Sequence, residues 1–201
     1  MTVVNVTNNI KKKLLESNFS TRFLDNCLNS KFLSIELQDE RIVGACFVGG
    51  MLNHSGIEIA EELRGKGIGK KLLSEIIDES KKRKFSYLTG VFKPSNTNSV
   101  KLHMNLGFVP LFTFYFNKTE GAEIPILVPF NKKGSFLISV SRIFNTKLGN
   151  LLFGFILSFL KPLLKNLIAF SNDEFPKLDL KYSTKNFEKI NETLANNGIQ
   201  K

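Results

Sequence analysis

Three glycines within five positions are the residues of this chain best suited to hold an anion, in the stretch Arg64-Gly65-Lys66-Gly67-Ile68-Gly69-Lys70. Because glycine lacks a Cβ atom, successive backbone N–H groups of such a turn can close on a phosphate group. Lys66, Lys70 and Lys71 add full positive charges beside these N–H groups. We therefore predict that this turn is a cradle for a pyrophosphate.

The elements on either side of the glycine turn must position the cradle. Ile57 and Ile59 alternate as strand residues do, and apolar residues recur at helical spacing after the turn, at Ile68, Leu72, Leu73, Ile76 and Ile77. The first turn of that helix leaves N–H donors without helical acceptors, at the positive end of the helix dipole. The spacing is neither that of a nucleotide P-loop nor that of a dinucleotide fingerprint. The sequence predicts a strand–turn–helix unit built around an anion.

A second motif, Asn96-x-x-Ser99-x-x-Leu102-His103-x-x-x-Gly107-Phe108, follows a strand-like stretch at Tyr87–Phe92. Together with Arg64-x-x-Gly67-x-Gly69, and in this order, it resembles the GNAT superfamily of N-acetyltransferases. The resemblance covers roughly residues 31–116. It carries more of the functional prediction than composition does.

The resemblance implies an α+β fold with a mixed central β-sheet, flanked by helices and splayed open after the strand that ends at Ile59. It also implies acetyl-CoA as co-substrate and direct attack of a primary amine on its thioester, which is an acyltransferase reaction of the EC 2.3.1 class. Backbone at Ile57, Glu58 and Ile59 would align the pantetheine arm. The remaining implied cofactor-binding positions are Arg64, Gly65, Lys66, Gly67, Ile68, Gly69, Lys70 and Asn96.

Asn96 and His103 each allow a functional and a structural interpretation. An Asn amide can donate to and accept from the cofactor arm, but Asn96 also precedes a predicted helix and could cap it. His103 stands where many members of the family carry a tyrosine as general acid. Imidazole can protonate a thiolate, and equally His103 could be a helix residue packed beside Phe108.

The general base is less defined, because the Tyr87–Phe92 strand ends in Val91 and Phe92, without a carboxylate. Glu58 and Glu61 are the remaining carboxylate candidates, acting directly or through water, and His54 at the head of the strand that contains Glu58 is a third candidate or a structural turn residue. Glu58 should face the opposite side of its strand from Ile57 and Ile59. Each of the two acids could instead be a solvated surface residue.

The composition predicts one catalytic domain with an extension. A chain of 201 residues, 42% of them hydrophobic, can bury one full core. We predict a catalytic domain over 1–130, an apolar and basic helical extension over 131–170, and a polar tail over 171–201. Cys27 and Cys46 lie in no redox or metal spacing, and the N-terminus resembles no signal peptide. These features favour a cytoplasmic chain without a metal or a nucleophilic cysteine.

The other elements are predicted from periodicity and turn residues. Helices are expected over 7–16 and 19–29, and a half-buried strand hairpin over 31–37 and 41–48. Further strands are expected over 109–116 and 124–130, joined by a turn at Glu120-Gly121. A last helix is expected over 185–196.

Residues 131–170 contain six cations and no acid, among many Phe, Leu and Ile residues. A polar stripe at helical spacing runs from Arg142 through Thr146, Asn150, Gly154, Ser158, Lys161 and Lys165. The uncharged run Leu148–Leu160 is too short to span a bilayer, and Pro162 should break the helix. Three interpretations remain: a membrane-surface element, a homodimer interface or cap on the sheet, and a lid over the acceptor site.

A formal net charge of +10 favours an anionic partner, such as an anionic lipid surface, an anionic small substrate or nucleic acid. Nucleic acid is the weakest of these, because Lys81–Lys84 closes an amphipathic helix, where cations are favoured anyway. The prediction is an N-acetyltransferase for a primary amine, with an amino sugar of an envelope-glycan precursor as the acceptor. The alternatives are a membrane-docked acyl-CoA-binding sensor without turnover, and an acyltransferase for a longer acyl donor.

Overall fold

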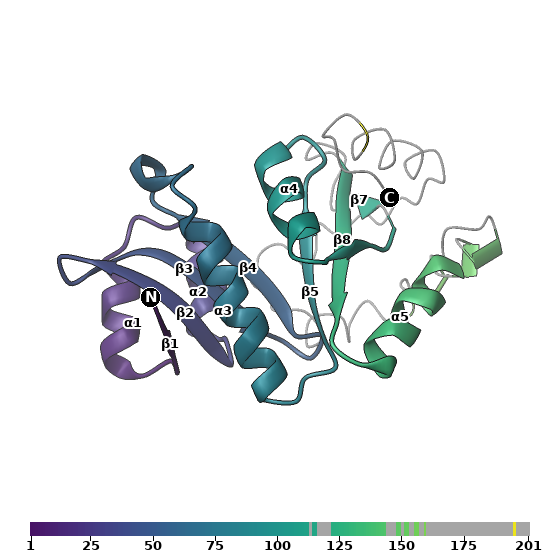
Figure 1. Ribbon diagram of the computed structural model, residues 1–201, viewed down its shortest axis with the longest axis horizontal. Coiled ribbons are helices and arrows are strands. Elements are labelled where there is room, and N and C mark those ends of the chain that lie inside the picture. Colours follow the sequence, from purple (N-terminus) through teal and green to yellow (C-terminus); the bar gives the residue numbers. More distant parts are fainter. Residues whose placement is uncertain are drawn as a thin grey trace. The chain divides into compact units, whose positions relative to one another are not determined.

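A computed structural model describes residues 1–112, 114–115, 122–143, 148–149, 151–152, 155–156, 159 and 195 of the chain. The described residues fall into two compact units, one over Met1–Leu88 and one that begins at Thr89 (Figure 1). The first unit carries the glycine turn. The second carries the motif around His103.

The first unit is an antiparallel sheet with helices on both faces. Its elements are β1 (Thr2–Val4), α1 (Asn8–Leu15), α2 (Thr21–Leu28), β2 (Phe32–Gln38), β3 (Arg41–Gly49), β4 (His54–Ile59), a 3₁₀ turn (Glu61–Leu63) and α3 (Ile68–Lys82). β1 pairs with β2, β2 with β3 and β3 with β4, each time antiparallel. The structure confirms the two predicted N-terminal helices, the β2–β3 hairpin, the strand ending at Ile59 and the helix after the glycines.

The hairpin departs from the prediction in its burial. Its turn residues Asp39 and Glu40 adopt positive φ angles of 47° and 68°, as a two-residue hairpin turn requires. Phe32 and Ser34 are as fully buried as Leu33, which alternates with them. The expectation of a half-buried hairpin is therefore wrong for this end of β2.

Helices on both faces of β2 account for its burial. Leu33 and Ile35 belong to one core cluster with residues of α1 and α2, including Leu14 and Phe23. On the other face, the Ser34 hydroxyl donates to the Glu75 carboxylate of α3. Each face of the strand is thus closed by a helix, and the buried hydroxyl has a partner there.

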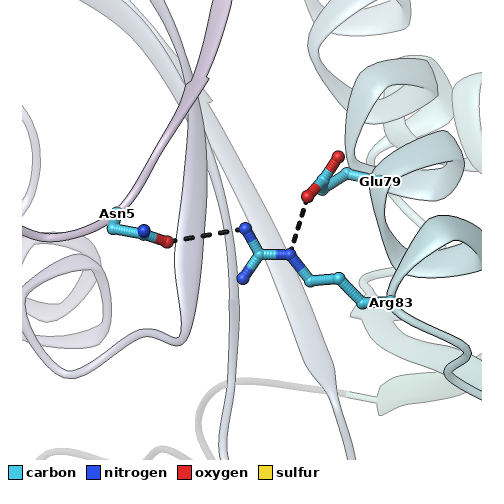
Figure 2. Close-up of polar contacts among 3 residues, drawn as sticks. All are labelled: Asn5, Glu79 and Arg83. Carbon is cyan, nitrogen blue, oxygen red and sulfur yellow. Dashed lines mark hydrogen bonds and ion pairs between the residues drawn. The ribbon is translucent and has the colours of Figure 1, made fainter.

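Arg83 connects the end of α3 to the start of the chain (Figure 2). Its Nε donates to Glu79 Oε1 at 2.7 Å, and its Nη2 donates to Asn5 Oδ1 at 3.5 Å. The guanidinium carbon also lies 4.2 Å from the centroid of the Phe32 ring, within cation–π range. A cation from the basic run Lys81–Lys84 therefore has a structural role.

The second unit contains β5 from Thr89 onward (the strand is Tyr87–Phe92), α4 (Thr97–Asn105), β6 (Val109–Pro110), β7 (Phe114–Tyr115), β8 (Ala122–Pro129) and α5 (Lys132–Ile143). β6 and β7 both pair antiparallel with β8. α5 packs on β8, and Gly134, Ile138 and Ser141 are buried among those of its residues whose burial the structure describes. In this unit β8 is therefore the strand with which β6 and β7 pair and on which α5 packs.

The strand predicted over 109–116 is two short strands, β6 and β7. Pro110 pairs with Ile126 and Phe114 with Glu123, so three residues on one side oppose two on the other. An extra residue of this kind interrupts the ladder, and Pro110 has no N–H to donate. The turn at Glu120-Gly121, the helix over 185–196 apart from Ala195, and most of the polar stripe lie outside the described residues.

Candidate functional site

The glycine turn lies between the end of β4 and the start of α3. Gly65 and Gly67 have φ angles of +80° and +79°, in the left-handed region that other residues rarely adopt. A Cβ atom built on either glycine would meet no atom within 4 Å. The two glycines are therefore required by the backbone conformation and leave open space above the turn.

The N-terminus of α3 opens directly from this turn. Gly67 is the N-cap residue and makes no side-chain cap, and the first turn holds no acidic residue. The first helical N–H groups have no acceptor one turn back in the helix, and Lys66, Lys70 and Lys71 are exposed beside them. Ile68 and Gly69 face inward, half-buried and buried respectively. The arrangement presents backbone donors and cations to solvent on one side, which suits an anion.

Arg64 braces the strand end that precedes the cradle. Its Nε donates to the Ile59 carbonyl at 3.3 Å, and Nη1 lies 3.7 Å from Glu61 Oε1. The Glu61 side chain is 88% exposed. The Arg64–Glu61 pair thus lies at the surface, and Glu61 has the position of a solvated acid.

Glu58 is held by the loop that precedes α2. Its Oε1 accepts the backbone N–H of Ser20 at 2.9 Å, and its Oε2 accepts the Ser20 hydroxyl at 2.8 Å. Ser20 is the N-cap residue of α2 and makes no cap with its own side chain. Ser20 is not among the residues predicted for the site, although a serine directly before a helix is a recognised signal.

The side of β4 to which Glu58 belongs agrees with the prediction. Glu58 pairs with Ala45, which lies in the core cluster of α1 and α2. Ile59 pairs with Gly44, and a Cβ atom built on Gly44 would contact Leu72 and Ile68 of α3. Glu58 therefore points to the α2 face of the sheet, and Ile57 and Ile59 point to the α3 face.

The two cysteines, Cys27 and Cys46, belong to the first unit, and both are free and fully buried. Burial raises the pKa of the Cys27 thiol, and the negative charge of Glu58 raises it further. Burial likewise raises the pKa of Cys46, with Cys27 as a second cause. A raised pKa favours the thiol form of both sulfurs, whereas the thiolate is the nucleophilic form of cysteine.

Asn96 caps α4 in the second unit. Its Oδ1 accepts the backbone N–H of Ser99 at 3.0 Å, which is the geometry of an N-cap. The structural interpretation of Asn96 is thereby confirmed. The cap uses the amide oxygen, so contact of the exposed amide nitrogen with a cofactor arm stays a prediction.

His103 is buried in α4, with 4% of its surface exposed. Its Nδ1 lies 2.8 Å from the Ser99 carbonyl oxygen, so Nδ1 carries the proton that makes this bond. The ring packs against Phe92 and, edge to face, against Phe108, with centroids 6.2 and 5.1 Å away. Burial lowers the pKa of His103, against a smaller opposing effect of the Ser99 bond. The residue is a neutral, packed imidazole, and its acid role stays a prediction.

The end of the second motif builds the C-terminus of α4. Gly107 has a φ of +83°. Phe108 N–H donates to the His103 carbonyl and Gly107 N–H to the Met104 carbonyl, both at 3.1 Å. This is a Schellman motif, closed by the ring contact between Phe108 and His103. The residues from His103 to Phe108, which contribute to the resemblance to the GNAT superfamily, therefore also form the C-terminal end of a helix.

Among the described residues, no three His, Cys, Asp or Glu side chains are grouped as metal ligands would be. Acids and histidines of the site are instead engaged singly, Glu58 with Ser20 and His103 with Ser99. The described candidate residues thus fall into two groups, the glycine cradle with β4 in the first unit and the Asn96–His103 helix in the second unit.

Comparisons with known proteins agree with this arrangement. A model of the Acetyltransferase (GNAT) family matches residues 11–108. The IAA acetyltransferase from Bacillus cereus has a TM-score of 0.51 at 20% identity, over 64% of this chain and 97% of that chain. No curated protein sequence matched.

Two further solved structures share the fold. A GNAT family acetyltransferase from Elizabethkingia anophelis, solved with acetyl-CoA bound, has a TM-score of 0.52 at 20% identity, over 64% of this chain and 97% of that chain. An acetyltransferase of the GNAT family from Streptococcus pneumoniae has a TM-score of 0.52 at 15% identity, over 64% and 99%. Residues 11–108 of this chain form an acetyltransferase domain of the GNAT family, within an α+β fold.

Proposed function

We propose that this domain transfers an acetyl group from acetyl-CoA to a primary amine. The observation that carries the proposal is the cradle at Gly65–Lys70, where two left-handed glycines and the N-terminus of α3 leave open space beside exposed lysines. These features fit the pyrophosphate of coenzyme A, because a Cβ atom at either glycine would occupy that space. The thioester of the bound acetyl-CoA supplies the activated acetyl group.

The other cofactor contacts follow the family pattern. The backbone of Ile57, Glu58 and Ile59 would align the pantetheine arm, and Asn96 would contact it. Arg64 would contribute by bracing the end of β4, where its Nε donates to the Ile59 carbonyl. These assignments are proposals. They require no change in the hydrogen bonds that Arg64 and Asn96 already make.

Glu58 is the general base that we propose. Its carboxylate is oriented by two hydrogen bonds from Ser20 and keeps acceptor capacity on both oxygens for the proton of an amine or of an intervening water. Glu61 is the alternative base, but its carboxylate lies at the surface beside Arg64. Fixed orientation favours Glu58, because a base must be held within reach of the proton it takes.

The burial and the hydrogen bond of His103 favour a packing role for this residue over a role as general acid. The proton of a neutral His103 is on Nδ1 and engaged with the Ser99 carbonyl, and burial disfavours a second proton on the ring. An imidazole in this state has no free proton to give to a departing thiolate. This observation also motivates the second candidate function, an acyl-CoA-binding sensor without turnover.

For the acceptor we propose an amino sugar carried by an anionic envelope-glycan precursor. Exposed lysines around the cradle and the net charge of +10 support an anionic substrate. GNAT enzymes as a class act on small-molecule or protein amines, so protein amino termini and polyamines are the competing acceptors. A longer acyl donor is the competing donor.

Calorimetric titration of acetyl-CoA into the full chain, followed by a thiol-release assay across an amine panel, tests this function. The panel starts with amino-sugar nucleotides and includes peptide amino termini and polyamines. Binding with thiol release confirms an acetyltransferase and identifies the acceptor class. Binding without release from any amine supports the sensor, and no binding by folded protein overturns both.

A further inference from the structure

A stripe of large apolar side chains in the second unit faces solvent. Among the described residues beyond α5, Leu148, Leu151, Leu152, Phe155, Ile156 and Phe159 are helical and between 42% and 79% exposed. Their spacing of three and four residues places them on one face of a helix. Such a face is normally the one that a helix buries.

Large apolar side chains are also exposed to solvent on α5. The residues of α5 that pack inward are Gly134, Ile138 and Ser141, one of them a glycine and one a serine. Phe136 is 67% exposed and Leu137 is 37% exposed. Two large apolar side chains of α5 therefore point outward although Ile138 is buried, and the outward surface is a candidate docking site.

The charge of this region decides between possible partners. Residues 131–170 contain six cations and no acid. Two copies of the chain meeting through this region would bring like charges together, whereas an anionic surface would neutralise them. Charge complementarity therefore favours an anionic partner over a second copy.

The length of the helices bears on how such a partner is met. Within the described residues, no helix combines the length and apolarity needed to cross a bilayer. A helix with an apolar face and flanking cations can instead lie in the plane of a membrane surface, with its long lysine side chains reaching the headgroups.

We propose that the docking face, defined as Phe136 and Leu137 of α5 with the stripe from Leu148 to Phe159, binds an anionic lipid surface. The apolar side chains would enter the boundary between headgroups and acyl chains, and Lys132 and Lys133, which are exposed at the start of α5, would lie among the phosphates. The inference is independent of the proposed acetyl transfer, because it uses none of the residues of the cradle.

Vesicle co-sedimentation of the full chain tests the proposal. One set of vesicles contains phosphatidylcholine alone, and the other contains phosphatidylcholine with phosphatidylglycerol. We expect the protein to sediment with the anionic vesicles, and the bound fraction to fall as salt is raised. Failure to bind the anionic vesicles, or equal binding to both kinds, would overturn the proposal.

A matched pair of double variants assigns the binding to the docking face. Leu151→Glu with Phe155→Glu places two acids in the stripe, at side chains that are 73% exposed in both cases. The control, Leu15→Glu with Met51→Glu, makes the same change at side chains in the first unit that are 63% and 65% exposed. We expect the first pair to lose at least about tenfold in vesicle affinity and the control pair to keep it.

Thermal unfolding of both double variants checks that each still folds, and analytical ultracentrifugation distinguishes the competing occupant. Equal vesicle binding by the two double variants would overturn the assignment to this face. A wild-type dimer that Leu151→Glu with Phe155→Glu converts to a monomer, without vesicle binding by either protein, would instead identify a second copy as the partner and also overturn it.

Discussion

Glu58 of β4 and Ser20 before α2 are joined by two hydrogen bonds, from the Ser20 backbone N–H to Oε1 at 2.9 Å and from the Ser20 hydroxyl to Oε2 at 2.8 Å. A carboxylate from a strand thus lies at the N-terminus of a helix that precedes it by 38 residues. Negative charge is favoured at that helix end. The pair fixes the carboxylate and ties the α1–α2 loop to the strand.

Glu58→Gln tests the proposed base. The amide keeps the shape of the side chain but cannot take a proton, so we expect kcat to fall by about 10²- to 10⁴-fold with acetyl-CoA affinity unchanged. Steady-state thiol release and calorimetry measure the two quantities.

Two substitutions in the neighbouring 3₁₀ turn complete that comparison. Glu62→Gln changes another exposed acid of the turn and should leave kcat as it is. A large loss of kcat in Glu61→Gln, with wild-type turnover in Glu58→Gln, would move the base to Glu61.

Gly67→Asn tests the cradle with little backbone strain. Asparagine tolerates the left-handed conformation better than most residues, and no atom of the chain lies within 4 Å of the new Cβ. We expect the free energy of unfolding to change little, and acetyl-CoA affinity to fall at least about tenfold because the side chain fills the anion space.

Gly107→Asn is the matched control for that substitution. Gly107 has a φ of +83°, close to the +79° of Gly67, but it ends α4 and has no part in the cradle. Its variant should bind acetyl-CoA as the wild type does. An equal loss of affinity in the two variants would show that the glycine conformation matters and the open space does not.

Because His103 is buried, we expect the free energy of unfolding to depend on pH. Burial lowers the pKa of His103 in the folded protein below its ordinary value of 6.5. As the pH falls through that value, the unfolded chain therefore binds more protons than the folded protein does. The folded state should therefore be most stable above this range and lose stability below it. Urea unfolding between pH 8 and pH 5 measures the effect.

His103→Gln removes the titrating group while it keeps a donor for the Ser99 carbonyl. The difference in unfolding free energy between wild type and this variant should grow in favour of the variant as the pH falls. A difference that stays constant with pH would mean that His103 is not held neutral by burial.

Gly56 and Phe47 form a packing pair across β3 and β4. A Cβ on Gly56 would lie 2.5 Å from Cε1 of the Phe47 ring, and that ring is buried against Phe23. Gly56→Ala should therefore lower the free energy of unfolding by about 1–3 kcal/mol. Phe47→Leu should relieve the clash, so the double variant should lose less than the sum of the single losses, and additive losses would contradict the pairing.

Local features of this site could be predicted from the sequence, because they depend on residues near one another in the chain. The left-handed conformations of Gly65 and Gly67 follow from the absence of a Cβ atom, and the caps of α4 follow from Asn96 and Gly107. The β2–β3 hairpin and the face of β4 that carries Glu58 follow from strand alternation.

The tertiary structure decided the features that depend on what packs against each residue. The neutral state of His103 results from burial against Phe92, and the bond from Ser20 to Glu58 joins distant parts of the chain. Sequence periodicity predicts that one face of a helix is apolar, but it does not say what covers that face. Only the fold shows that Ser34 is buried while Phe155 is exposed, because burial is a property of neighbouring elements.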